Sequence, residues 1–191
     1  MYRKINNIFS LSEIAEIQSG VFAKPEGDGN FAYLQAKHFD SEGRLARDLH
    51  AELKTSKITR KHQLYPNDIL FAAKGSKNFA TLYEAHNPLA VASTTFLIIR
   101  VKGGMVLPEY LTWYINTSDM QSNLQQLSKG TSIKAISKKS LESLEIPVPS
   151  IDNQRVILEI AKLRIRERDI QQTIHAKRNQ LIDYYISKAL K

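Results

Sequence analysis

Cysteine is absent from this chain of 191 residues. Disulfides, thiolate metal sites and cysteine nucleophiles are therefore excluded. No apolar run reaches the roughly 18 residues that a membrane span needs, and Arg3 and Lys4 are not followed by the apolar stretch of a signal peptide. We therefore expect a soluble, cytoplasmic protein that makes no membrane contact.

Recognisable catalytic and cofactor motifs are also missing from the sequence. Lys74-Gly75-Ser76 resembles the end of a phosphate-binding loop but lacks the upstream glycine. Neither an Asn-Pro-Pro-Tyr-type methyltransferase motif nor a nuclease-like cluster of carboxylates and lysine occurs. The histidines are scattered without metal-ligand spacing: His38, His50, His62, His86 and His175. We therefore predict a protein that is not an enzyme and has no cofactor and no metal site.

Positive charge is what the chain has in excess, with 27 Lys and Arg against 19 Asp and Glu and a net charge of +8. This excess of positive charge is expected of a protein that binds a polyanion, although an ordinary basic soluble protein would have the same excess. Lysine gathers with glycine and small polar residues in the segments 74–78, 129–134 and 137–139. Such residues suit phosphate contacts, and the alternative for each segment is a solvated loop.

From these segments we predict a set of DNA-binding residues: Lys74, Ser76, Lys77, Asn78, Lys129, Thr131 and Lys134. Lysine and threonine suit phosphates, whereas Asn78 suits a base edge, adenine by preference. The turn-rich segment from Gln18 to Asn30 is a further candidate for reading DNA.

The pattern of apolar residues predicts a mixed α+β body over residues 1–150. The predicted helices are Leu11–Ile17, Pro108–Ile115 and a stretch through Met120, Leu124 and Leu127 that Gly130 stops; the predicted strands are Phe31–Gln35, Asp68–Ala73, Ala92–Val101 and Leu141–Val148.

Residues 151–191 contain neither glycine nor proline and predict one long helix. Alternating steps of four and three residues from Val156 give a seam in which seven of ten positions are apolar. A helix packed on its own domain is one interpretation. However, this helix is longer than the diameter of a domain of about 150 residues, so we favour pairing with a partner helix. The predicted dimerisation residues are Ile160, Leu163, Ile170, Ile174, Leu181 and Tyr184.

The order of several segments resembles the specificity (S) subunits of type I restriction-modification systems. The matching segments are Leu11–Gly20, Leu64–Ser76, Val91–Arg100, Leu107–Ile115, Gly130–Ile136, Leu141–Pro149 and Asn153–Ile157. Each segment alone is a weak signal, whereas their succession before a long helix is specific.

The resemblance implies a non-catalytic protein that binds double-stranded DNA and directs methyltransferase subunits, and possibly the restriction subunit, to a target. A typical S subunit has two target-recognition domains and two long helices that pack antiparallel. This chain has one of each, so the resemblance implies a half-subunit that forms a homodimer through an antiparallel coiled coil and reads a bipartite target. A fragment of a longer subunit and a half that pairs with a different half are the other interpretations. The alternative is an interaction or inhibitor protein that mimics an S subunit without reading DNA.

Overall fold

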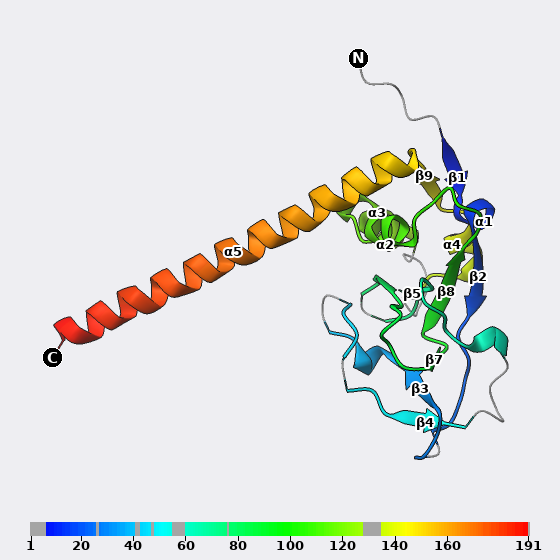
Figure 1. The fold of residues 1–191 in the computed structure, drawn as a ribbon, viewed down its shortest axis with the longest axis horizontal. Coiled ribbons are helices and arrows are strands. Elements are labelled where there is room, and N and C mark those ends of the chain that lie inside the picture. Colours follow the sequence, from blue (N-terminus) through cyan, green and yellow to red (C-terminus); the bar gives the residue numbers. More distant parts are fainter. Residues whose placement is uncertain are drawn as a thin grey trace. The chain divides into compact units, whose positions relative to one another are not determined.

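The computed structural model of the chain describes residues 7–25, 27–40, 43–46, 48–54, 60–75, 77–127 and 135–190. The chain divides into two compact units, residues 1–154 and residues 155–191. Strands and short helices mix in the first unit and one long helix follows, which confirms the predicted α+β class (Figure 1). The elements are β1 (Ile8–Ser10), α1 (Leu11–Ile14), β2 (Ala15–Ser19), β3 (Phe31–Leu34), η1 (Ala36–His38), β4 (Ala51–Leu53), η3 (Arg60–His62), β5 (Ile69–Ala72), β6 (Ala80–Leu82), β7 (Ala90–Ala92), β8 (Phe96–Val101), α2 (Pro108–Ile115), α3 (Ser118–Leu127), α4 (Lys138–Glu142), β9 (Glu145–Pro147) and α5 (Ile151–Ala189).

The strands of the described residues form three sheets. The largest is antiparallel with the order β2-β8-β5-β6. In the second sheet β3 lies between β4, to which it is antiparallel, and β7, to which it is parallel. The third joins the N-terminal β1 to β9, which ends shortly before α5 begins. In Figure 1 the β1–β9 pair lies at the opposite end of the first unit from β3 and β4.

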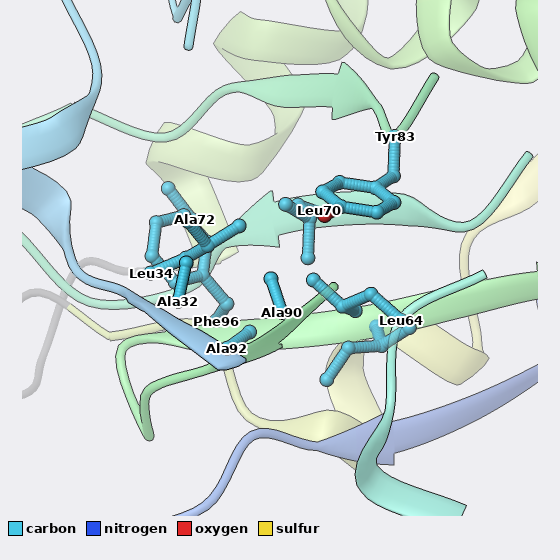
Figure 2. Packing of buried hydrophobic residues seen from close by; sticks show 10 residues of the cluster. Ala32, Leu34, Leu64, Leu70, Ala72, Tyr83, Ala90, Ala92 and Phe96 are labelled. Carbon is cyan, nitrogen blue, oxygen red and sulfur yellow. The ribbon is translucent and has the colours of Figure 1, made fainter. Parts of the chain in front are cut away.

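One apolar cluster holds the two larger sheets together (Figure 2). Leu70 of β5 and Phe96 and Ile98 of β8 contribute from the larger sheet, and Leu34 of β3 contributes from the smaller one. These four side chains are at most 1% exposed. Because side chains two residues apart on a strand share a face, each strand offers alternate residues to this cluster. The packing fixes the ends of β5, β7 and β8 relative to one another, which positions the turns described below.

The predicted helix over Leu11–Ile17 is wrong in its second half, where β2 replaces it from Ala15 onward. The helix begins as predicted at Leu11, directly after the capping residue Ser10, whose backbone N–H and hydroxyl both donate to the Glu13 carboxylate. Beyond Ile14 the side chains of Ala15 and Ile17 are buried and Glu16 is exposed. This alternation suits a strand, and pairing with β8 decides the outcome.

The predicted strand over Leu141–Val148 is also shorter than expected. Residues 138–142 form α4, and only Glu145–Pro147 form β9. The Ser137 hydroxyl accepts a hydrogen bond from the Ser140 N–H at 3.0 Å and caps α4 at its start. Leu141 is buried from the helix rather than from a strand. A local capping residue therefore outweighed the apolar pattern that predicted a strand.

The long helix α5 is anchored at its first turn by Gln154, which is completely buried. Its side-chain oxygen accepts from the Leu107 N–H at 2.8 Å, and its Nε2 donates to the carbonyls of Met105 and Pro149 at 2.8 and 2.9 Å. These bonds tie the start of the helix to the segment before α2. The helix runs for 39 residues, or about 58 Å at 1.5 Å per residue.

Candidate nucleic-acid interface

A turn at residues 93–95 separates β7 from β8, where the sequence predicted one continuous strand. The two strands belong to different sheets, because β7 pairs with β3 whereas β8 pairs with β2 and β5. The Ser93 N–H donates to the carbonyl of Leu34 at 2.8 Å, which holds the turn on the smaller sheet. The chain thus changes sheets at this turn without any glycine or proline to mark it.

The segment after β2 lies against one side of this turn. The Gly20 N–H donates to the carbonyl of Phe96 at 3.0 Å, and the Val21 N–H donates to that of Ala92 at 2.9 Å. A Cβ added at Gly20 would come within 2.1 Å of the Ser93 carbonyl oxygen. Glycine is therefore required at position 20 for this close approach. The contact brings the start of the candidate segment Gln18–Asn30 to the turn.

The segment after β5 lies against the other side. The N–H groups of Ala73 and Lys74 both donate to the carbonyl of Thr95, at 2.9 and 3.3 Å. Lys74 also forms an isolated antiparallel bridge with Ala135, and the Ile136 N–H donates to the Ala73 carbonyl at 2.8 Å. Ala135 directly follows the predicted DNA-binding segment 129–134. The start of the 74–78 segment and the residue after the 129–134 segment are therefore neighbours.

We call the surface formed by residues 20–24, 73–78, 93–95 and 135–136, as far as they are described, the turn surface. Lys74 and Lys77 are exposed on it. Asn78 is half-buried, and its Nδ2 donates to the Ala72 carbonyl at 2.7 Å, which holds the two ends of the loop together. The remaining predicted DNA-binding residues lie outside the described residues: Ser76, Lys129, Thr131 and Lys134.

Backbone geometry also distinguishes the loop after Lys74. Gly75 has a φ of +132°, a conformation that side chains rarely adopt, and a Cβ there would meet nothing within 4 Å. Its requirement for glycine is therefore conformational, and the backbone is open to an approaching group. Sequence reasoning found this loop from its composition but missed the turn at 93–95, because Ala-Ser-Thr-Thr-Phe reads as a run of strand-forming residues.

The predicted dimerisation residues form an exposed apolar stripe on α5. Their exposed fractions lie between 46% and 64%: Ile160, Leu163, Ile170, Ile174, Leu181 and Tyr184. Further exposed apolar side chains lie off the seam, and the heptad pattern did not include them: Ile165, Ile182, Tyr185 and Ile186. Three of these four fall within residues 182–186, so the helix is most apolar near its C-terminal end.

A half-buried ion pair lies at the other end of the larger sheet. Asp68 is 1% exposed, and Arg100 donates to its two carboxylate oxygens through Nε and Nη2 at 2.7 and 2.6 Å. The hydrogen bonds with Asp68 raise the pKa of Arg100. The Tyr65 N–H also donates to Asp68 at 2.9 Å, and the Tyr65 ring lies 5.1 Å from the guanidinium. With its hydrogen bonds satisfied, this pair serves the fold by joining β5 to β8.

Among the described residues, no group of three or more His, Cys, Asp or Glu side chains gathers as a metal site would require. Burial lowers the pKa of His38 and His62. The Nδ1 of His38 accepts a hydrogen bond from the Gln35 N–H at 3.1 Å, which requires the neutral ring. No described helix is both long and apolar enough to span a bilayer.

Known proteins share both the sequence pattern and the fold of this chain. A family model for the type I restriction modification DNA specificity domain matches residues 4–180, and the chain therefore belongs to that family. This confirms the resemblance inferred from the order of the sequence segments. No curated protein sequence matches the chain.

Solved structures with a similar fold come from the same systems. One is a chain from a structure of the assembly and conformational transition of the type I R-M system, with a TM-score of 0.67, 16% identity and 90% of this chain covered. The HsdS subunit from Thermoanaerobacter tengcongensis has a TM-score of 0.63, 17% identity and 84% coverage, and the type I S subunit from M. genitalium has 0.58, 16% and 85%. This chain spans only 41%, 37% and 40% of their respective lengths.

Proposed function

We propose that the protein is the non-catalytic subunit that selects the DNA sequence for a type I restriction-modification complex in the cytoplasm. In this role residues 1–150 form the target-recognition domain, and residues 151–191 form the dimerisation helix. The domain binds double-stranded DNA, and the protein assembles with methyltransferase subunits and possibly with the restriction subunit. The observation that carries the proposal is that Gly20, within one candidate segment, and Lys74, at the start of another, both bond to the backbone at the turn between β7 and β8 or next to it.

The charge and chemistry of the turn surface support binding to DNA. Lys74 and Lys77 are exposed there, and Ala135, which follows the lysine-containing segment 129–134 in the sequence, forms a bridge with Lys74. An inhibitor that mimicked an S subunit would not need its candidate segments to share one surface. Gly20 and Val21 bond to the residues that flank the turn at 93–95, and Lys74 bonds to Thr95 within it, which favours the DNA-reading function over that alternative.

The exposed stripe on α5 supports a homodimer of half-subunits. Exposed Ile and Leu at seam spacing gain free energy when a second helix covers them. Two copies related by a two-fold axis place two recognition domains on one DNA, so the target is an interrupted palindrome.

The proposal is tested by measuring duplex binding of the chain assembled with its methyltransferase subunit over a range of salt concentrations. If the four predicted lysines of each copy contact phosphates, the slope of log K against log salt is about −7 for the dimer. Affinity should then fall about 150-fold for each doubling of salt. Assembly with the methyltransferase subunit but no binding to any duplex would overturn the proposal and favour the inhibitor alternative.

A further inference from the structure

Phe22 is the most exposed large apolar side chain in the described part of the first unit, at 86%. Its neighbours Val21 and Ala23 are half-buried and pack against the cluster of Phe31, Tyr33, Leu53 and Val91. Successive side chains of an extended segment point to opposite sides. Because Val21 and Ala23 face the cluster, Phe22 is directed into solvent by the backbone itself.

A buried hydroxyl fixes this arrangement. Tyr33 is 4% exposed, and its hydroxyl donates to the Val21 carbonyl at 2.9 Å and accepts from the Ala23 N–H at 3.2 Å. One side chain therefore holds the backbone on both sides of Phe22. An aromatic ring gains nothing from exposure to water, and a backbone fixed in this way reduces the entropy lost when the ring meets a partner.

The location of Phe22 indicates which partner it meets. Its neighbour Val21 is bonded to Ala92 and bridged to Ser93, so the backbone at Phe22 lies beside the turn at 93–95, to whose Thr95 carbonyl the Lys74 N–H donates. Lys24, two residues further on, is exposed. Asp28 lies beyond Gly27, where the Gly29 N–H donates to the carbonyl of Ala51, the first residue of β4.

We propose that Phe22 contacts the bases of bound duplex DNA and contributes to target discrimination. The inference rests on the proposed function and assigns a base-contacting residue to it. An uncharged aromatic ring adds little to phosphate binding, so its contribution must come from the bases. It packs against a thymine methyl group or enters between neighbouring base pairs, both of which are apolar contacts that depend on sequence.

The test is selection of bound duplexes from a pool with randomised sequence, using the chain assembled with its methyltransferase subunit. The wild-type complex should enrich a defined motif. Phe22→Ala should enrich the same motif with one or two adjacent base pairs no longer specified, and discrimination at those positions should fall about tenfold, the cost of one misread base pair. Its salt dependence should equal that of the wild type, because no charge is removed.

Leu89→Ala is the matched control. Leu89 is 53% exposed and precedes β7, whereas Ser93 follows it, so Leu89 lies at the far end of that strand. This variant should enrich the complete wild-type motif. Tyr33→Phe, which removes the hydroxyl but keeps Phe22, should weaken discrimination at the same base pairs as Phe22→Ala, with a smaller loss.

Two results would overturn the inference while leaving the proposed function intact. One is a complete motif enriched by Phe22→Ala. The other is weaker assembly of Phe22→Ala with the methyltransferase subunit or with a second copy in the absence of DNA, which would assign the ring to a protein contact. A wild-type complex that enriches no motif would instead contradict the proposed function itself.

Discussion

Replacing Ile170 with aspartate should convert the proposed dimer into a monomer. Ile170 is half exposed on the seam of α5. Burying a whole isoleucine side chain is worth about 1.5–3 kcal/mol, so covering the exposed half contributes about 0.75–1.5 kcal/mol per copy. Both copies carry the substitution in a two-fold dimer, which makes the loss about 1.5–3 kcal/mol. The dissociation constant should therefore rise about 10- to 150-fold from lost burial alone.

Aspartate adds a second penalty, because the dimer would have to take two unpaired carboxylates out of water. The mass of the wild type and of the variant should be measured by sedimentation equilibrium or light scattering over a range of concentrations. The wild type should have twice the 21.7 kDa of one chain, and the variant should have the mass of one chain.

Ile165→Asp is the matched control for this experiment. Ile165 is 52% exposed on the same helix, but it lies about 200° around the helix from Leu163, away from the seam. Its substitution should leave the dimer intact. Monomeric wild-type protein at every concentration would refute the reasoning, and so would equal dissociation by the two variants, because the seam would then have no special role.

Three further perturbations test other parts of the structure. Lys74→Ala should weaken binding to all duplexes alike and reduce the salt slope of the dimer by about 2, whereas Lys102→Ala, an exposed lysine just after the far end of β8, should leave the slope unchanged. Gln154→Leu leaves three backbone groups without their buried partner and should lower the free energy of unfolding in urea by about 2–4 kcal/mol, against about 0.5 kcal/mol or less for Asn153→Leu. Burial lowers the pKa of His38 below 6.5, so the folded state binds fewer protons than the unfolded chain. The resulting stability is present above pH 6.5 and is lost as the pH falls through the pKa of the folded state. The urea midpoint of the wild type should therefore fall between about pH 7.5 and pH 5.5, and His38→Gln should reduce that fall.

The long helix was predictable because its signals are local. Residues 151–191 lack glycine and proline, and apolar residues recur at intervals of three and four. The strands predicted at Asp68–Ala73 and Ala92–Val101 were likewise visible as two runs of strand-forming residues. The observed β5 and β8 fall within these runs and are hydrogen-bonded neighbours.

The centre of the candidate site was not predictable, because tertiary contacts create it. Ser93 breaks the run from Ala92 to Val101 only because its N–H bonds to Leu34 and Gly20 packs against its carbonyl. Gln154 looked like any polar residue near the start of a helix. Its role depends on backbone groups at Met105 and Leu107, 49 and 47 residues away in the sequence.

Mapping the methylated positions in DNA from cells that carry this chain with its methyltransferase subunit tests the central claim most directly. The methylated motif should have two half-sites that are inverted copies of each other, separated by an unspecified spacer. Methylation should disappear when the chain is removed. An uninterrupted motif, half-sites of unrelated sequence, or methylation that persists without the chain would contradict the claim that two copies of this protein read the target.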